Sequence, residues 1–414
     1  MCVSQLQLAI LLGMTVALGP LALDAYLPAF PQIAADLNVD HTDIGLTLSI
    51  YVGALGLTQL VGGPLSDRYG RQVVLLGGLF VFAVAAAMVA QASSLNEMLG
   101  WRLVQGMGGA FCAVSVPAIV RDQFHGKDAA RLFGLIGLIM FIAPAAAPTL
   151  GVILLAVADW PAIFLMLTVY AVFLAVVLKL RLFRQLPAKE RVKTPVSTLV
   201  TNYSLVLRHW VTMRFVGIQA LCFSAMLVFI THASFIYQEW FGLSNTLFSA
   251  LFAANIVLMA SLNIFNRYLL RHFEAVSILR VSVLLQFIAL LVLVALAWVG
   301  APWWVIAGCI VTAVGFMGSI IPNNMANALE FFPHLGGTAA AMLGATQFTL
   351  AGAISAFSTT VVEESLLNVV IVMAVCSMLA AILAFGAPRA VRREVAKIEA
   401  AADAAVLPEP ASQG

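Results

Sequence analysis

The sequence predicts an all-α membrane protein with twelve transmembrane helices arranged in two six-helix halves. Of its 414 residues, 62% are hydrophobic and only 10% are charged, whereas about 25% of the residues of an ordinary soluble domain are charged. Apolar runs that reach the roughly 20 residues needed to cross a bilayer recur along the whole chain. The one long polar stretch between them, residues 181–212, divides these runs into six and six.

Hydropathy locates each predicted span to within a few residues. The first half, residues 1–180, carries spans at about 6–30, 44–63, 73–92, 98–120, 132–156 and 161–179. A cytoplasmic linker follows at 181–212, and the second half, residues 213–388, carries spans at about 213–237, 246–266, 275–299, 303–325, 337–360 and 366–386. Residues 389–414 are expected to form a cytoplasmic tail with a short charged helix and a disordered end.

The basic residues indicate the orientation of the chain. If the N-terminus is cytoplasmic, 20 of the 21 lysines and arginines lie in inner segments and no outer loop contains one. Outer connections instead carry acids and tryptophans, such as Asp159 and Trp160. Because cytoplasmic loops of membrane proteins are enriched in lysine and arginine, the pattern predicts cytoplasmic N- and C-termini. The remaining basic residue, Arg102, lies inside a span.

The first span contains a carboxylate, Asp24, followed four residues later by Pro28. An acid inside a membrane helix is costly and usually faces a water-filled cavity or a partner. Pro28 has no N–H to donate to the carbonyl of Asp24, so the predicted kink leaves a free backbone acceptor beside the carboxylate. This segment is therefore the first candidate for a site that holds a proton, a cation or a polar ligand.

Arg102 lies at a depth comparable to that of Asp24, about one to two turns inside the outer ends of their spans. One interpretation is that the two side chains pair, directly or through water. Asp24 then gains and loses a proton during transport, and Arg102 tunes that exchange through its charge. The alternative is that Arg102 snorkels to the outer surface and Asp24 faces a wet crevice without a coupling role.

No other chemistry is indicated. The five cysteines lie far apart and mostly inside apolar runs, which favours neither a metal cluster nor a disulfide framework. The sequence offers no nucleophile and base pair and no phosphate loop, since the glycines of 106–109 lie within a span and not after a strand. We therefore expect no enzymatic activity, no metal, and no cofactor beyond the proton as coupling ion.

A tripeptide echo relates the two halves. Asp-Arg-Tyr at 67–69 lies between the second and third spans, and Asn-Arg-Tyr at 266–268 lies between the eighth and ninth, an offset of 199 residues. Repeated halves with a substrate site at their interface are a transporter architecture.

The connection between the second and third spans, GGPLSDRYGR at 62–71, is glycine-rich and basic. We expect a tight turn in which Asp67 caps a helix N-terminus such as that at 336–338; a generic basic turn is the alternative. Residues 63–71 match the pattern G-x-L-x-D-x-x-G-R in full, and here the chain resembles the major facilitator superfamily. The conformational residues that this resemblance implies are Gly63, Asp67, Arg68, Gly70 and Arg71.

Two further stretches support the resemblance. Residues 102–110, RLVQGMGGA, are similar to the family's fourth-span motif R-x-x-Q-G-x-G-x-A, whose arginine is associated with proton coupling. Residues 23–28, LDAYLP, resemble the first-span motif of drug:proton antiporters of the bicyclomycin- and chloramphenicol-resistance group. The similarity continues through 234–244 and 322–339, and so covers nearly the whole chain. It implies the major facilitator fold and proton coupling through Asp24 and Arg102.

The fifth span departs from the antiporter pattern G-P-x-x-G-G. Here the residues at 147–152 read APTLGV, which keeps the proline and one glycine. Pro144, Pro148 and Gly151 are expected to shape a kinked helix whose packing limits leak, and a purely structural role is the alternative.

A substrate site between the halves would draw on aromatic and amide side chains, which suit a lipophilic, weakly polar compound. Core packing is the alternative for each of them, and His232 either handles protons or bonds a carbonyl group. The candidates are Tyr26, Tyr51, Phe141, Phe229, His232, Tyr237, Asn255, Asn323 and Gln347.

The resemblance implies a monomeric transporter of a bacterial-type inner membrane that exports small, mostly hydrophobic, drug-like compounds in exchange for protons by alternating access. Its expected partners are then the small molecule and the lipid bilayer, and no nucleic-acid partner is expected. A proton symporter of the same fold that imports a nutrient is one alternative, and a membrane sensor without transport is another.

Overall fold

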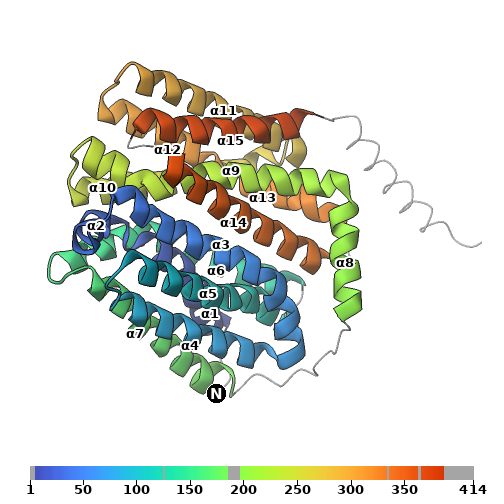
Figure 1. Cartoon of the computed structure of the whole chain (residues 1–414). Helices are drawn as coiled ribbons and strands as arrows, with labels where there is room; N and C mark the ends of the chain where they lie inside the picture. The colour runs from blue at the N-terminus through green and yellow to red at the C-terminus, as the bar shows by residue number, and fades with distance from the viewer. Residues whose placement is uncertain (1–4, 125, 185–195, 333–334, 362–364, 387–414) are drawn as a thin grey trace, which may run out of the picture.

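The computed structural model describes residues 5–124, 126–184, 196–332, 335–361 and 365–386. Within these ranges, twelve helical segments are long and apolar enough to cross a membrane. Figure 1 shows them as two bundles, coloured blue to green and yellow to red, that meet along α3 and α14. The predicted fold class is therefore confirmed. The tail predicted at 389–414 lies outside the described residues.

The helices follow the chain in two sets. The first half contains α1 (Gln5–Asp24), η1 (Leu27–Ala29), α2 (Phe30–Leu37), α3 (His41–Tyr69), α4 (Arg71–Val89), α5 (Leu95–Gln123), α6 (Gly126–Leu155), α7 (Pro161–Val177) and η2 (Leu178–Leu182). The linker helix α8 (Val196–Arg208) and the second half follow, with α9 (Trp210–Ser234), η3 (Phe235–Trp240), α10 (Asn245–Leu269), α11 (Ala275–Trp298), α12 (Trp303–Gly315), α13 (Met317–Glu330), α14 (Gly336–Val361) and α15 (Leu366–Phe385).

The turn predicted at 62–71 is mostly helix. α3 continues through Pro64 to Tyr69, and the chain breaks only at Gly70, whose φ of 94° is in the region that favours glycine. Hydropathy ended this span at residue 63 because it counts polar residues as loop. A helix nevertheless extends beyond the hydrocarbon layer readily when its last turn is basic, as at Arg68, since a cation there complements the helix dipole.

The linker between the halves also contains structure that the sequence reading missed. The Tyr203 hydroxyl of α8 donates a hydrogen bond of 3.1 Å to the carbonyl of Leu60 in α3. On the same helix, Val206 is fully buried against Ala339 and Met342 of α14. α8 therefore touches both halves at the end of the bundle that carries Arg71, which we call the basic end (Figure 1).

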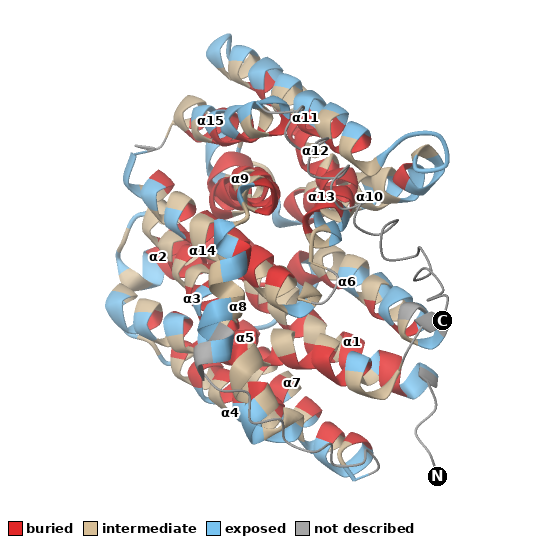
Figure 2. Cartoon of the chain, turned by 90° about the vertical axis from the view of Figure 1, so that its right-hand side faces the viewer, coloured by how far each residue is buried: buried red, intermediate tan, exposed pale blue. Residues whose placement is uncertain are grey.

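Burial places α9 near the centre of the molecule. Figure 2 looks onto the basic end and shows α9 almost entirely in the buried colour, with helices of both halves around it. Most residues of α9 between 211 and 234 are buried. By contrast, α11 contacts other helices of the second half, namely α12, α13 and α15. The long span containing α9 is thus central, and α11 lies at the periphery.

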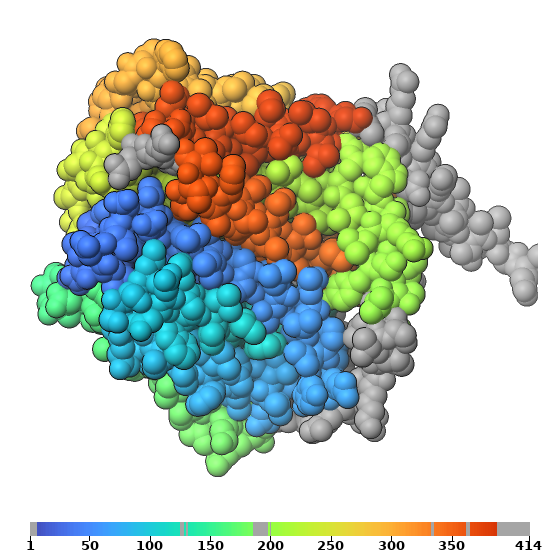
Figure 3. All heavy atoms as spheres, in the orientation of Figure 1, coloured from blue at the N-terminus to red at the C-terminus, as the bar shows by residue number. Residues whose placement is uncertain are grey.

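The two halves meet most extensively along α3 and α14, whose colours adjoin on the surface in Figure 3. The approach is close enough to require glycine. A Cβ atom added at Gly352 would lie 2.7 Å from the backbone nitrogen of Gly53 and 2.8 Å from the carbonyl oxygen of Ser49. Small residues allow membrane helices to pack backbone against backbone. A hydrogen bond of 2.8 Å between Ser49 and Ser355 joins the halves at the same seam.

We expect Gly352→Ala to lower the melting temperature of the detergent-purified protein, because overpacking of a tight contact typically costs about 1–3 kcal/mol. Gly53→Ala is the matched control, since a Cβ there meets no atom within 4 Å although the residue lies at the same crossing. Differential scanning fluorimetry of both variants checks this. Equal melting temperatures for the two variants would show that the contact between α3 and α14 accommodates the added methyl group without loss of stability.

Candidate functional site

The first span breaks at the buried acid. α1 ends at Asp24, and the chain resumes as a short 3-10 helix at Leu27 before α2. Pro28 is the cause, because a proline removes the hydrogen bond to the carbonyl four residues earlier and its ring clashes with that carbonyl. That carbonyl belongs to Asp24, so the kink predicted from the sequence is confirmed and falls at the carboxylate itself.

The carboxylate of Asp24 is buried without a partner. The residue is 5% exposed, and its Oδ1 atom receives no hydrogen bond. Among the described residues, no lysine, arginine or histidine nitrogen lies within 4.0 Å of it. Burying an ionised carboxylate without a partner is costly. Asp24 is therefore a group with unused capacity to hold a proton or to accept a hydrogen bond.

Arg102 is fully buried, so the interpretation that it snorkels to the surface is wrong. Arg102 also does not form a direct ion pair with Asp24, which was one of the arrangements predicted from the sequence. Its guanidinium donates to the carbonyl of Ala22 at 3.1 Å, to Oε1 of Gln105 at 2.7 Å and to the hydroxyl of Tyr26 at 3.1 Å. Arg102 thus binds the residues on either side of Asp24 and not the carboxylate.

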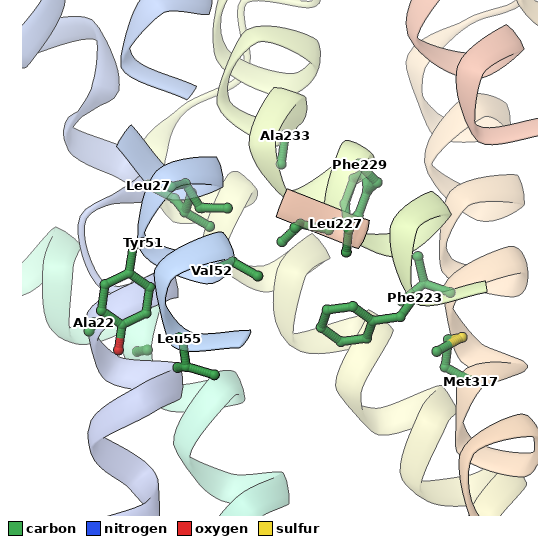
Figure 4. Packing of buried hydrophobic residues seen from close by; sticks show 14 of the residues in the cluster. Ala22, Leu27, Tyr51, Val52, Leu55, Phe223, Leu227, Phe229, Ala233 and Met317 are labelled. Carbon is green, nitrogen blue, oxygen red and sulfur yellow. The ribbon is translucent and has the colours of Figure 1, made fainter. Parts of the chain in front are cut away.

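Aromatic rings complete the surroundings of Arg102. Its Cζ atom lies 4.6 Å from the ring centroid of Tyr26, 4.5 Å from that of Tyr51 and 5.7 Å from that of Phe164. Such cation–π contacts stabilise a desolvated cation. Figure 4 shows the ring of Tyr51 beside Ala22, whose carbonyl Arg102 also binds. Neutral groups therefore compensate this charge, and Tyr26 and Tyr51 act here as its neighbours.

Helix α6 packs directly on the break. A Cβ added at Gly151 would overlap the carbonyl oxygen of Ala25, the residue after Asp24. Only glycine allows this approach, which explains why this position of the span-five pattern is kept. Pro144 and Pro148 lie inside α6, which remains helical through both. Gly151 thus lies at the site, whereas no contact of the described residues assigns a specific role to the two prolines.

At the basic end, the loop motif forms an ionic network. Arg71 donates from Nε to Asp122 at 2.9 Å, and its Nη1 lies 2.5 Å from Asp67 and 3.1 Å from Ser66. Asp122, at the end of α5, was not identified from the sequence. Its position next to Arg121 in the last turn of the helix could have suggested a role in an ionic contact. Asp67 was predicted to cap the helix N-terminus at 336–338, but its carboxylate pairs with Arg71. The side chain that lies near Gly337 is that of Arg121.

The remaining residues of the motif are peripheral. Gly63 faces open space, and the guanidinium of Arg68 lies 5.6 Å from the ring centroid of its neighbour Tyr69. The break itself depends on Gly70.

The second half repeats this arrangement with neutral side chains. Asn323 donates to Oδ1 of Asn266 at 2.6 Å, and Ser319 donates to the same oxygen at 3.3 Å. Asn266 is the counterpart of Asp67 in the tripeptide echo. Asn323, a candidate for substrate binding, is therefore engaged in the packing of α10 against α13, apart from Asp24.

Two further aromatic candidates lie in the second half. Phe229 and Tyr237 pack with Phe248 and Phe252, with ring centroids 6.1 to 6.4 Å apart. Figure 4 shows Phe229 projecting from α9. Asn255 follows Phe252 on α10 and is 2% exposed, and its Oδ1 atom has no partner. Phe141 is half-buried on α6.

Two more candidates, His232 of α9 and Gln347 of α14, form polar contacts between these two helices. Nε2 of His232 lies 2.9 Å from the Ser358 hydroxyl, and Gln219 donates to Gln347 at 3.0 Å. His232 is therefore held by a hydroxyl group and not by the carbonyl that the sequence reading suggested as the alternative. The structure gathers Asp24, Arg102, Tyr26 and Tyr51 at one site. The other candidates lie on α6, α9, η3, α10, α13 and α14.

The fold and the buried charges are those of a multi-pass membrane transporter. The family model of the Major Facilitator Superfamily matches residues 12–356, and the chain belongs to this superfamily.

Curated relatives agree with this assignment. The chain is 30% identical over 357 residues to an MFS-type transporter, YdgK, of Bacillus subtilis, covering 85% of this chain and 88% of the relative. It is 27% identical to a bicyclomycin resistance protein homolog of Haemophilus influenzae, with 82% and 85% covered. It is 31% identical to a chloramphenicol resistance protein of Pseudomonas aeruginosa, with 78% and 77% covered. The predicted resemblance to this group is confirmed.

Solved structures confirm the fold. A D-xylose–proton symporter superposes with a TM-score of 0.72 at 14% identity, covering 92% of this chain and 96% of that chain. A nucleoside transporter, NupG, gives a TM-score of 0.73 at 15% identity, covering 92% and 99%.

We expect Tyr26→Phe to destabilise the protein and Tyr51→Phe to leave its stability nearly unchanged. The Tyr26 hydroxyl bonds to Thr47 at 3.0 Å and receives Arg102, whereas the Tyr51 hydroxyl has no partner. Both variants keep the ring below the guanidinium. Losing a hydrogen bond to a charged group costs about 1.5–3 kcal/mol. Melting temperatures in detergent test the difference, and a larger loss for Tyr51→Phe would contradict it.

Proposed function

We propose that this protein exports small, mostly hydrophobic compounds across a bacterial inner membrane in exchange for protons, by alternating access. The names of two relatives refer to resistance to bicyclomycin and to chloramphenicol, which supports small antibiotic-like molecules as substrates. The observation that carries the proposal is the buried, unpartnered carboxylate of Asp24 at a helix break.

The arrangement around Asp24 supports proton exchange at this residue. Arg102 donates from its two Nη atoms to Ala22, Gln105 and Tyr26 and not to the carboxylate, and its Nε has no hydrogen-bond partner. Asp24 is only 5% exposed and its Oδ1 atom has no hydrogen-bond partner, so this geometry favours the neutral acid, because an isolated buried charge is costly. Losing the proton therefore requires that water or substrate reach the site.

The cycle follows from this requirement. A proton arriving from the outside neutralises Asp24, and the neutral carboxyl tolerates closure of the end opposite the basic end. Contacts across that end support such a closed state: Gln238 donates to the carbonyl of Pro28 at 3.4 Å, and His41 lies 3.4 Å from Glu239. Substrate binding and proton release to the cytoplasm favour each other, and the halves then rock about α3 and α14 to return the loaded site outward.

We expect Asp24→Asn to abolish proton-driven efflux while the protein still inserts and folds. Asparagine keeps the shape of the side chain but cannot exchange a proton. The measurement is efflux of radiolabelled chloramphenicol from proteoliposomes under an imposed pH gradient. Asp40→Asn is the matched control, because Asp40 is an exposed acid of the same half with no side-chain capping bond.

Three outcomes of this experiment would contradict the proposal. Gradient-dependent efflux that persists in Asp24→Asn would remove this carboxylate from the coupling. Uptake driven by an inward proton gradient, in place of efflux, would make the protein a symporter of the same fold. If no tested compound moves at all although several bind, a sensor without transport is favoured.

The proposed orientation is tested separately. Green fluorescent protein fused after Gly414 should fluoresce, and alkaline phosphatase fused at the same position should be inactive, because both report a cytoplasmic C-terminus. The basic end, with Arg71, Arg121 and Arg267, would then face the cytoplasm, as the enrichment of cytoplasmic loops in arginine requires. The reverse pattern of reporter activity would invert the transport direction assigned above.

A further inference from the structure

A groove of about 350 Å³ lies in the second half, away from Asp24 and the seam between the halves. It is bounded by Leu262 and Leu269 of α10, by Ser277 and Leu285 of α11, and by Phe316, where the tenth span breaks. Val281, in its wall, is 55% exposed. Since α11 is a peripheral helix of a membrane protein, this opening faces lipid. The volume is within the range of small-ligand pockets.

The groove arises from close contacts beside it. α12 ends at Gly315 and α13 begins at Met317, so the tenth span is interrupted at Phe316. A Cβ at Gly315 would press on Leu258, and one at Gly318 would overlap the carbonyl oxygen of Met259. These glycines hold the tenth span against α10, and the groove lies on the side of this contact that includes α11.

The shape of the groove selects a linear occupant. Its lining extends along α11 from Ser277 to Leu285, which is about 12 Å at 1.5 Å per residue, and along α10 over about 10 Å. Both helices cross the membrane, so the groove is aligned with them and with lipid chains. We propose that it binds one acyl chain of an anionic phospholipid, with the headgroup at the turn between α10 and α11.

The chemistry of the wall favours hydrocarbon over a polar compound. Its two buried hydroxyl groups are already used: Ser282 donates to Ser319 at 3.0 Å, and Ser319 donates to Asn266 at 3.3 Å. The remaining wall consists mainly of leucine, isoleucine, valine and phenylalanine side chains. A polar ligand would therefore find few unpaired groups in the wall, whereas a chain of methylenes fits it.

The charge at one mouth of the groove selects the headgroup. Two lining residues, Leu269 and Phe273, flank a turn that carries Arg271 and His272. Arg267 precedes this turn, and Glu274 is its one acid, so the net charge there is positive. Basic residues at the membrane surface attract anionic lipids. The mouth lies at the basic end, where a phospholipid of the adjoining leaflet presents its phosphate group.

The test uses the purified full-length protein in nanodiscs that contain phosphatidylglycerol and phosphatidylcholine in equal amounts. Native mass spectrometry after release into detergent should find at least one phosphatidylglycerol retained, enriched about fivefold over phosphatidylcholine. Val281→Trp should lose this lipid because the indole ring fills the groove. Val292→Trp is the matched control, since Val292 is an exposed residue on nearly the same face of α11 outside the groove.

A second groove variant, Ser277→Trp, provides an independent test in case Val281→Trp misfolds. A variant is compared with the wild type only if the two elute alike in size-exclusion chromatography. Arg271→Gln should keep a retained lipid but lose the preference for phosphatidylglycerol. Retention that is equal in Val281→Trp, Ser277→Trp and Val292→Trp would overturn the proposal. Displacement of the lipid by chloramphenicol would overturn it also, by making the groove a substrate route. None of these readouts requires proton-coupled transport, so the proposed function is tested independently.

Discussion

The fully buried guanidinium of Arg102 is the constraint on which the first half depends. A cation in the hydrocarbon layer persists only if protein groups replace its water. Here the carbonyl of Ala22, the amide of Gln105 and the phenol of Tyr26 do so. Ala22 and Tyr26 belong to the segment that carries Asp24. Arg102 therefore ties α5 to both sides of the helix break, and the first span is held where its backbone is irregular.

The same contacts leave the carboxylate of Asp24 free. Arg102 grips the chain at residues 22 and 26, and Gly151 of α6 presses on the carbonyl of Ala25. The position of Asp24 is thus fixed by its neighbours, and its oxygen atoms take no part in holding the break together. In the proposed cycle this separation matters, because the helix break keeps its contacts when Asp24 gains or loses a proton.

The sequence predicted the features that depend on hydropathy and on single residues that are costly in a membrane. It did not predict the contacts that depend on side-chain geometry. Twelve spans follow from hydropathy, and Asp24, Pro28 and Arg102 stand out because each is expensive in a membrane. Distances between spans cannot be read from local sequence, so it could not be predicted that Arg102 would bind the carbonyl of Ala22 and not the carboxylate of Asp24. The helix α8 was missed because its residues are too polar for a span, although Tyr203 and Val206 dock it on α3 and α14.

The two halves show how one architecture accepts different chemistry according to exposure. Asp67 and Asn266 are 199 residues apart, and Asp122 and Asn323 are 201 apart. The contacts differ, because Asp67 and Asp122 both pair with Arg71, whereas Asn266 accepts a hydrogen bond directly from Asn323. The side chain of Asp67 is 43% exposed and carries a charge, whereas Asn266 is 2% exposed and neutral. Burial disfavours charge, so amides replace the ion pair where water is absent. Water and salt weaken exposed ion pairs, whereas the buried amide contacts are shielded from both, so the first-half network is the one that ionic conditions can loosen.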